Sequence, residues 1–266
     1  RHTRCLSDWS SDVCSSDLVD DGDALVVATS GSTGVPKGVV LTHDAVRASA
    51  TATSDRLGTG ADDMWLACLP LSHVGGLSVI TRALHTGANL VVHDGFDANE
   101  VEAAARNGAT AVSLVSTALA RIDPTLFRVI VLGGSRPPAV RPANSVATYG
   151  LTETGSGVVY DGVPLEGVEV RIVDHEVQLR CPMQLRAYRD GTTPVDSDGW
   201  LHTNDSGELT PDGRLIVHGR RGDMIVTGGE NVWPDAVEHA LAEVPGVAAV
   251  AVAGAPRSGE HTSELQ

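Results

Sequence analysis

The sequence predicts an α/β protein: a mostly parallel sheet with helices forms a large domain, followed by an antiparallel β subdomain and a truncated α+β domain at the C-terminal end. Short apolar runs alternate with helical segments as far as Leu132, which is typical of parallel strands connected by helices. From Val168 onward, apolar residues alternate and Pro211-Asp212-Gly213 predicts a hairpin turn, so this part is expected to be an antiparallel sheet.

The first half is expected to alternate strands and helices. The expected strands are Ala24–Thr29, Val39–Leu41, Met64–Leu69, Asn89–His93, Ala111–Val115 and Arg128–Leu132, and the expected helices are Ala45–Arg56, Leu77–His85 and Ala98–Asn107. The apolar run at Ala24–Thr29 predicts a buried strand. Thr42 or Asp44 is expected to cap the first helix, because either side chain can accept a hydrogen bond from a free N–H group of the first turn. Gly-rich turns after the strands place ligand groups at the carboxyl edge of the sheet.

The second half is expected to be antiparallel, with a helix near its end. The turn at Pro211–Gly213 connects two predicted strands, Gly207–Leu209 and Leu215–Val217. A helix is predicted to begin at Trp233-Pro234-Asp235, because proline is favoured in the first helical turn. Its expected apolar face consists of Val237, Ala240, Leu241 and Val244, and Pro245-Gly246 and a strand over Val247–Val252 are expected to follow it.

The composition limits the classes of partner that the protein is expected to bind. The formal net charge is −15, which argues against nucleic acid or an anionic membrane as a partner, although a local cationic cluster can still bind an anionic substrate. No apolar run approaches 18 residues and no apolar leader is visible, so we expect neither a membrane helix nor a signal peptide. The 4 cysteines form no C-x-x-C pair, which fits a reducing cytoplasm. The sequence does not indicate an oligomeric state.

The most informative stretch is the polar loop Thr29-Ser30-Gly31-Ser32-Thr33-Gly34-Val35-Pro36-Lys37-Gly38, which contains the only lysine of the chain. Glycine exposes backbone N–H groups, and the hydroxyls and the lysine supply further donors, so the loop is suited to a polyphosphate. An ordinary polar loop between a strand and a helix is the alternative. The spacing is not that of the nucleoside-triphosphatase P-loop, since Pro36 precedes the lysine and Gly38 follows it.

All ten positions of this loop fit T-S-G-[ST]-T-G-x-P-K-G, and the loop thus resembles the signature of the AMP-forming adenylate ligases, the superfamily of acyl-CoA synthetases, luciferases and adenylation domains. In that family the loop wraps the β- and γ-phosphates of ATP. The resemblance implies a phosphate-binding role here for Thr29, Ser30, Gly31, Ser32, Thr33, Gly34 and Lys37. It also implies ATP, Mg²⁺ and CoA as cofactor and co-substrates.

A second stretch, Tyr149-Gly150-Leu151-Thr152-Glu153-Thr154, would by itself be read as a solvated loop. Together with the first loop it resembles the family motif Y-G-x-T-E. The resemblance implies that Tyr149 stacks on adenine beside Gly150, that Thr152 contacts the α-phosphate and that Glu153 ligates Mg²⁺. Gly133 and Gly134 match the family's glycines that border the adenine and acyl pockets.

Two further stretches resemble the family's ribose and hinge motifs. Gly199–Asp205 resembles [WY]-x-x-T-G-D with Asn204 in place of the usual glycine, which implies that Asp205 accepts the ribose hydroxyls; an ordinary β-turn aspartate is the alternative. Arg220 is implied to reach the ribose. Gly222 occupies the family's pivot position, which is normally Asp or Lys, and glycine there permits rotation but supplies no charge.

The resemblance also implies which carboxylic acid is the substrate and which reaction the protein catalyses. His73 occupies a position that is aromatic or His at the mouth of the family's carboxylate pocket, although a lone histidine is more often structural. Stretches at Gly95-Phe96-Asp97, Ser113-Leu114-Val115 and Val158–Leu165 resemble the short o-succinylbenzoate–CoA ligases of actinobacterial menaquinone synthesis. The implied substrates are therefore o-succinylbenzoate, ATP and CoA. Another aryl- or fatty-acyl-CoA ligase is the alternative.

The ends of the chain look different from its centre. Residues 1–18 and 257–266 are aperiodic and resemble translated sequencing-adapter tails, so we expect them to be non-native. Between them we expect a large domain over 19–219, a hinge at 220–223 and a truncated small domain over 224–256. The family's C-terminal catalytic lysine is absent, and Ser135–Thr148 is shorter than usual, which could damage the sheet. These features predict weak ATP binding and slow adenylation, or an inactive nucleotide-binding fragment.

Overall fold

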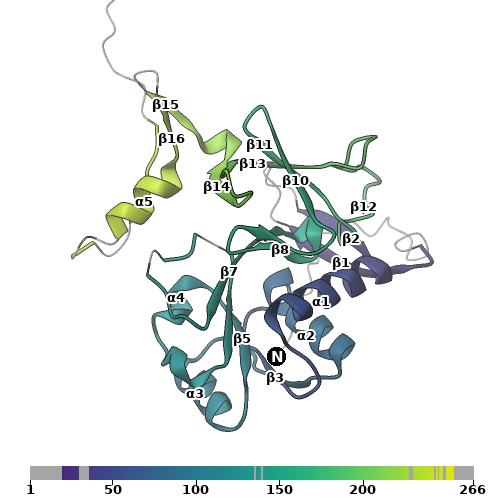
Figure 1. Ribbon diagram of the computed structural model, residues 1–266, viewed down its shortest axis with the longest axis vertical. Coiled ribbons are helices and arrows are strands. Elements are labelled where there is room, and N and C mark those ends of the chain that lie inside the picture. Colours follow the sequence, from purple (N-terminus) through teal and green to yellow (C-terminus); the bar gives the residue numbers. More distant parts are fainter. Residues whose placement is uncertain are drawn as a thin grey trace, which may run out of the picture.

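The computed structural model describes residues 20–29, 36–134, 136–138, 140–227, 230–242, 244, 246–247 and 250–254. In Figure 1 an α/β layer lies at the bottom, antiparallel strands lie above it, and α5 lies to one side with β15 and β16. The tails expected at 1–18 and 257–266 lie outside the described residues.

A seven-stranded sheet forms the base of the molecule, in the order β4-β3-β5-β6-β7-β8-β9. Its strands are β3 (Met64–Ala67), β4 (Asn89–Val92), β5 (Ala111–Leu114), β6 (Val129–Leu132), β7 (Ser145–Leu151), β8 (Ser156–Tyr160) and β9 (Val163–Pro164). The pairs from β4 to β7 are parallel, whereas β8 and β9 join as antiparallel strands. The predicted mostly parallel sheet is therefore confirmed.

Helices cover both faces of this sheet, because alternate residues of each strand point to opposite sides. They are α1 (His43–Leu57), α2 (Val74–Thr86), α3 (Ala98–Arg106) and the short α4 (Ser116–Leu119), with the 3-10 turn η1 (Pro124–Leu126). Trp65 shares one core with α1 and α2, while its neighbour Leu66 shares a second core with α3 and α4. Continuous apolar runs such as those of β5 and β6 are what a sheet buried on both faces requires.

The helix termini follow from local chemistry. Thr42 caps α1 by accepting a hydrogen bond from the Ala45 N–H group at 3.1 Å, so Thr42 rather than Asp44 is the cap. Helix α2 begins at Val74, three residues before its predicted start. Gly76 makes this early turn possible, since a Cβ atom there would lie 2.5 Å from the Leu69 and Pro70 carbonyl oxygens. The sequence did not predict α4.

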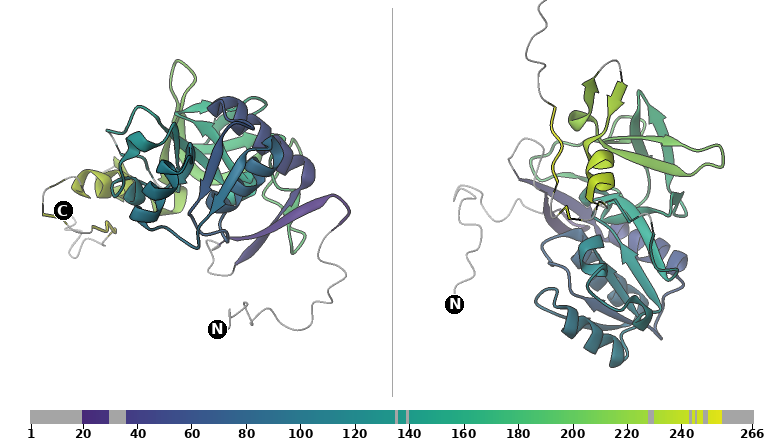
Figure 2. Two further views of the ribbon diagram at one scale, coloured as in Figure 1. Left: turned by 90° about the horizontal axis from the view of Figure 1, so that it is seen from below. Right: turned by 90° about the vertical axis from the view of Figure 1, so that its left-hand side faces the viewer.

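The strand expected to be buried at the start of the chain lies instead at an edge. Strand β1 (Asp23–Thr29) pairs antiparallel with β2 (Lys37–Thr42), which also pairs with β12 (Ala187–Tyr188). Within β1 only Val27 is buried and Val26 is 41% exposed, and among the described strands β1 pairs with β2 alone. The Gly-rich loop therefore connects two antiparallel strands and not a strand and a helix. Figure 2 shows this purple hairpin at the periphery of the molecule.

The predicted antiparallel subdomain is confirmed as a four-stranded sheet in the order β10-β11-β13-β14. Its strands are β10 (Glu169–Val173), β11 (Glu176–Arg180), β13 (Leu201–Leu209) and β14 (Leu215–Arg220). The predicted turn at Pro211–Gly213 connects β13 and β14, and the N–H group of Thr210 donates to the carbonyl of Arg214 at 2.8 Å. In this register Asp205 lies opposite Arg220.

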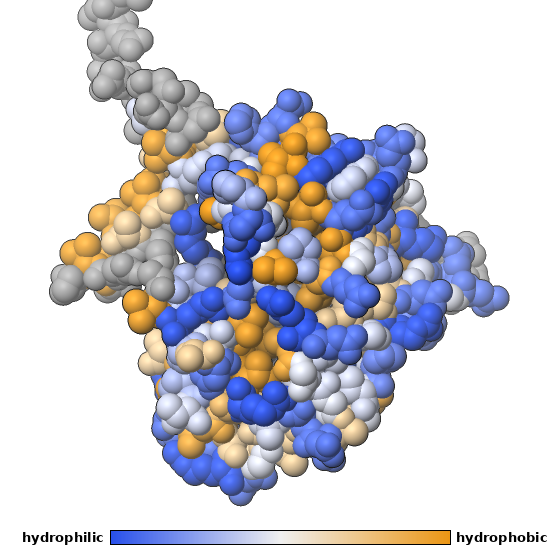
Figure 3. Space-filling model, viewed as in Figure 1, coloured by the Kyte–Doolittle hydropathy of each residue, from blue (hydrophilic) through white to orange (hydrophobic). Residues whose placement is uncertain are grey.

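The C-terminal part contains the 3-10 turn η3 (Arg221–Asp223), the hairpin of β15 (Ile225–Thr227) and β16 (Glu230–Val232), and the predicted helix as α5 (Pro234–Ala242). Of the strand expected over Val247–Val252, the described residues 247 and 250–252 lie in no strand, so this prediction is wrong for them. Leu241 and Val244 are 42% and 48% exposed, and Figure 3 shows apolar surface over the α5 segment. Among the described helices, none is long and apolar enough to cross a membrane.

The short connection before β7 leaves the sheet intact. Strands β6 and β7 are hydrogen-bonded neighbours, with Ile130 opposite Ser145. The Asn144 side chain donates to the carbonyl oxygens of Pro124 and Phe127 at 2.9 and 2.7 Å, which fixes the entry into β7. The expectation that the short Ser135–Thr148 connection damages the sheet is therefore wrong for the described strands.

Gly150 lies where β7 and β8 approach each other, and we expect any side chain at this position to disturb their packing. A Cβ atom there would lie 2.6 Å from the Gly157 Cα atom, against backbone that cannot move aside cheaply. We expect Gly150→Ala to lower the free energy of unfolding by about 2 kcal/mol, the usual cost of overpacking. Urea unfolding measures this change. The control is Gly60→Ala, where no atom lies within 4 Å of the new Cβ, and an equal effect of both substitutions would contradict the prediction.

Candidate functional site

A buried carboxylate, Asp205, forms the centre of the first part of the site. The Tyr149 hydroxyl donates to Asp205 Oδ2 at 2.8 Å, and Arg220 Nε lies 3.1 Å from Asp205 Oδ1. Arg220 also donates to the Thr203 carbonyl at 3.1 Å, and Thr203 Oγ1 accepts the Asp205 N–H group at 3.0 Å. Three residues singled out from the sequence, in β7, β13 and β14, therefore meet at one point.

Burial sets the protonation behaviour of this group. Asp205 is only 7% exposed, and its burial raises the pKa of the carboxyl above its usual value, against the opposing effects of Arg220 and of the Tyr149 hydroxyl. Burial of Tyr149 and the neighbouring Asp205 charge raise the pKa of the tyrosine well above 10. Tyr149 therefore remains a hydrogen-bond donor at neutral pH.

The backbone before Asp205 explains the unusual Asn204. Asn204 has φ = 58°, in the left-handed region, which glycine adopts freely and asparagine tolerates better than other residues. Its N–H group donates to Glu176 Oε1 at 3.0 Å. Asn204 therefore adopts a backbone conformation that the glycine usual at this position would adopt without strain.

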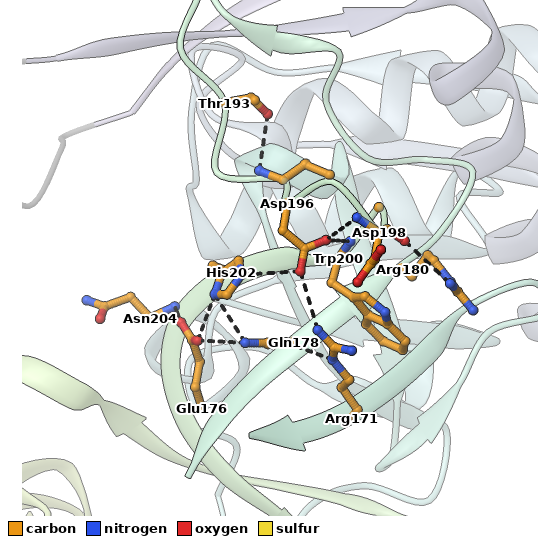
Figure 4. Close-up of polar contacts among 12 residues, drawn as sticks. Arg171, Glu176, Gln178, Arg180, Thr193, Asp196, Asp198, Trp200, His202 and Asn204 are labelled. Carbon is orange, nitrogen blue, oxygen red and sulfur yellow. Dashed lines mark hydrogen bonds and ion pairs between the residues drawn. The ribbon is translucent and has the colours of Figure 1, made fainter. Parts of the chain in front are cut away.

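Glu176 belongs to a polar network formed by side chains of the paired strands β11 and β13 (Figure 4). The Gln178 amide donates to Glu176 Oε2 at 3.0 Å, and His202 Nδ1 lies 3.0 Å from the same oxygen. Burial acts to raise the pKa of Glu176, but hydrogen bonds from Gln178, His202 and Asn204 outweigh it, so the pKa is lowered. No sequence motif indicates this network, because the residues of β11 and β13 become neighbours only through strand pairing.

The second part of the site joins Glu153 and Lys37 through a third residue. Glu153 lies in the 3-10 turn η2 (Thr152–Thr154) that follows β7, and the Tyr188 hydroxyl donates to Glu153 Oε1 at 2.8 Å. Lys37 Nζ, at the start of β2, lies 4.4 Å from the centre of the Tyr188 ring. Sequence reasoning missed Tyr188, because its strand has only two residues and gives no periodic signal.

Most of the predicted phosphate loop lies outside the described part of the chain, whereas Thr29 and Thr152 lie within it. Ser30, Gly31, Ser32, Thr33 and Gly34 lie outside the described residues, while Thr29 lies opposite Lys37 in the β1–β2 pair. Thr152 begins η2 beside Glu153.

Gly133 and Gly134 follow β6, next to β7. A Cβ atom on Gly133 would lie 3.1 Å from Thr148 Oγ1, and Gly134 has φ = 81°. His73 is exposed at the N-terminus of α2, and no hydrogen bond within the described part of the chain joins its side chain to Asp205 or Glu153.

The available ligands suit a magnesium ion that arrives with a nucleotide. Among the described residues, no group of three or more His, Cys, Asp or Glu side chains could hold a metal ion. Mg²⁺ is commonly bound by one or two carboxylates together with substrate phosphates and water. Glu153 offers one carboxylate with Oε1 fixed by Tyr188, and this fits a Mg²⁺–ATP complex better than a resident ion.

The chain belongs to the family of AMP-binding enzymes, whose model matches residues 7–185. Within it, the chain is 39% identical over 262 residues to the "Probable 2-succinylbenzoate--CoA ligase" of Mycobacterium tuberculosis, covering 89% of this chain and 68% of that protein. It is 35% identical over 272 residues to the 2-succinylbenzoate–CoA ligase of Bacillus cereus, covering 86% of this chain and 56% of the relative.

Solved structures agree with the sequence relatives. The o-succinylbenzoate coenzyme A synthetase (MenE) of Bacillus subtilis in complex with AMP superimposes with a TM-score of 0.81 at 32% identity, covering 89% of this chain and 57% of that structure. The complex of the same enzyme with ATP and magnesium ion gives a TM-score of 0.80 at 32% identity, covering 88% and 57%. The chain thus spans just over half the length of these Bacillus proteins.

Proposed function

We propose that the chain carries the ATP- and acyl-binding part of an ATP-dependent acid–CoA ligase, an o-succinylbenzoate–CoA ligase of menaquinone biosynthesis that works in the cytoplasm. The single observation that carries the proposal is the meeting of Tyr149, Asp205 and Arg220 around one buried carboxylate, since these residues come from three separate motifs. The names of the similar proteins support the choice of acid.

In the proposed complex the Asp205 carboxylate accepts the ribose hydroxyls of ATP, Arg220 lies beside the ribose and Tyr149 lies beside adenine. Gly133 and Gly134 leave room for the base, because side chains there would fill the space beside Thr148 and Val115, and Gly150 lies next to Tyr149 where β7 approaches β8. Thr152 contacts the α-phosphate. Glu153 holds Mg²⁺, which neutralises phosphate charge when bound.

Lys37 and the loop from Thr29 to Gly34 contact the outer phosphates. In the proposed reaction, an oxygen of the substrate carboxylate attacks the α-phosphorus, and the bond to pyrophosphate breaks. The thiol of CoA then attacks the acyl carbon, forming the thioester as AMP leaves and the thiol loses its proton. The protein contributes by positioning the reactants and by neutralising developing negative charge.

The proposal includes a division of the chain. Residues 19–219 form the large domain, 220–223 the hinge and 224–256 a small domain. Gly222 is the uncharged pivot, and a Cβ atom built there would have no other atom within 4 Å. His73 is placed at the mouth of the acid pocket.

Carboxylate-dependent exchange of pyrophosphate into ATP tests the function. We expect exchange with o-succinylbenzoate, at a slow rate, and little with benzoate or decanoate. Preference for another acid would instead favour a different acyl-CoA ligase. ATP binding without exchange for any acid would indicate an inactive nucleotide-binding fragment, and exchange at the rate of the full-length relatives would contradict the slow rate.

Lys37→Ala tests the phosphate loop. Removal of the only lysine is expected to weaken ATP binding about tenfold, as expected for the loss of one charge-assisted hydrogen bond. Isothermal titration with ATP and with AMP provides the readout, and AMP affinity serves as the control because AMP lacks the outer phosphates. Unchanged ATP affinity would remove Lys37 from the site.

ATP binding is expected to weaken as the pH falls through the pKa of Asp205, because the protonated carboxyl accepts ribose hydroxyls poorly. That pKa is raised by burial, so the loss begins at a higher pH than for an exposed aspartate. In Tyr149→Phe, loss of a hydroxyl that lowers this pKa should move the midpoint to still higher pH. Affinity measured across pH in both proteins checks this, since the titration of ATP itself is common to both, and equal midpoints would contradict it.

A further inference from the structure

We propose that Tyr188 is a positioning residue of the nucleotide site, whose hydroxyl orients Glu153 and whose ring orients Lys37. The inference rests on the proposed function and adds a residue that no motif singled out. It is carried by two contacts made from one side chain to two groups that come from distant segments, β2 and η2.

The hydroxyl contact fixes the carboxylate. Tyr188 donates to Glu153 Oε1 at 2.8 Å, so the carboxylate is held in one orientation and Oε2 can bind a ligand. Burial of Tyr188, together with the Glu153 charge, raises the pKa of the phenol far above neutrality, which keeps the hydroxyl protonated as a donor. A carboxylate held in one orientation loses less conformational freedom when it binds a cation than a free one does.

The ring contact fixes the cation. Lys37 Nζ lies 4.4 Å from the ring centre, within the range of a cation–π interaction. Lysine has a long flexible stem, and the aromatic face restricts the volume that its ammonium group samples. The ammonium group and the carboxylate, which would otherwise be attracted to each other, are thereby held on different parts of one phenol.

The backbone around Tyr188 makes this arrangement rigid. Tyr188 lies opposite Val39 in the β12–β2 pair, and its N–H group donates to the Thr192 carbonyl at 2.7 Å. The N–H group of Leu185 donates to the Glu153 carbonyl, also at 2.7 Å. The segment thus contacts both β2 and η2 through main-chain hydrogen bonds, and the side chain contacts one functional residue on each.

Two substitutions separate the two contacts. Tyr188→Phe removes only the hydroxyl, so it should raise the Mg²⁺ concentration needed for half-maximal ATP binding about tenfold, while ATP affinity without Mg²⁺ stays within twofold. Tyr188→Leu also removes the ring and should additionally weaken ATP binding without Mg²⁺ about fivefold. Titration of the intact chain with ATP at a series of Mg²⁺ concentrations measures both values.

Tyr160→Phe is the matched control. It removes another tyrosine hydroxyl, which contacts Thr53 Oγ1 at 3.2 Å, and the Tyr160 side chain is fully buried. It should lower the melting temperature without changing the Mg²⁺ dependence. If Tyr188→Phe and Tyr160→Phe show the same Mg²⁺ dependence as the unsubstituted chain, Tyr188 is merely structural and the inference is overturned.

A double-mutant cycle tests the ring contact. Lys37→Ala should weaken ATP binding less in the Tyr188→Leu background than in the unsubstituted chain, because the lysine is no longer held there. Equal effects in both backgrounds overturn the role of the ring. Should Tyr188→Leu fail to fold, Tyr188→Phe still decides the role of the hydroxyl, and Tyr188→Met takes the place of the leucine variant in the cycle that tests the ring. If the unsubstituted chain shows no Mg²⁺-dependent ATP binding, the proposed function fails and this inference fails with it.

Discussion

Replacing Asp205 with asparagine is expected to weaken ATP binding by about 100-fold, the largest loss of affinity that we expect from one substitution. In the proposed complex the carboxylate accepts two ribose hydroxyls, and hydrogen bonds to a charged group contribute about 1.5 kcal/mol or more each. The amide keeps the shape of the side chain but loses its charge. Arg220 and the Tyr149 hydroxyl, which both contact this carboxylate, would then lack an ionised partner.

Isothermal titration with ATP measures this loss, and Asp212→Asn is the matched control. Asp212 lies in the turn of the same β13–β14 hairpin, where its side chain is 65% exposed and paired with Arg214. Its replacement should leave ATP affinity unchanged, since exposed ion pairs contribute little. An Asp205→Asn chain that folds and binds ATP as before would remove Asp205 from the nucleotide site and, with it, the observation that carries the proposed function.

Glu153→Gln is expected to slow carboxylate-dependent pyrophosphate exchange by at least about 100-fold while changing ATP affinity much less. The reason is that charge neutralisation matters more in the transition state than in the bound ground state. Glutamine still offers an oxygen to the Tyr188 hydroxyl, so the local structure should survive. Initial exchange rates at saturating ATP and o-succinylbenzoate measure the effect.

The control for Glu153→Gln is Glu166→Gln, the same substitution at an exposed position. Exchange in this variant should equal that of the unsubstituted chain. If Glu153→Gln lowered ATP affinity as much as it lowered the exchange rate, Glu153 would act in binding alone. If it lowered neither, another residue would hold the metal.

Much of the fold could be predicted from short stretches of sequence. The apolar runs that became β5 and β6 were recognisable because strands buried on both faces need uninterrupted apolar residues. The cap of α1 and the β13–β14 turn depend on local hydrogen bonds; the turn was predicted, and Thr42 was one of the two caps predicted for α1. The position of β1 was not, since an apolar run does not reveal whether its strand has neighbours on both sides.

The site, like the fold, has residues that the sequence motifs identify and contacts that only the structure reveals. The motifs identified Asp205, Arg220 and Tyr149, but no motif indicates that the Tyr149 hydroxyl donates to the Asp205 carboxylate. That contact depends on packing between β7 and β13, strands of different sheets. Tyr188 carries no motif of its own, and its importance became visible only from what its side chain contacts.

By itself, then, the sequence determined the family-specific loops, the order of strands and helices from β1 to β6 apart from α4, and the residues that we propose for the nucleotide site. These properties depend on residues close together in the chain, where spacing and side-chain type are enough. Only the tertiary structure decided that β1 lies at an edge, that Asn204 adopts the left-handed conformation against Glu176, and that Tyr188 joins Lys37 to Glu153. Each of these depends on contacts between segments far apart in sequence, which form only when the whole chain folds.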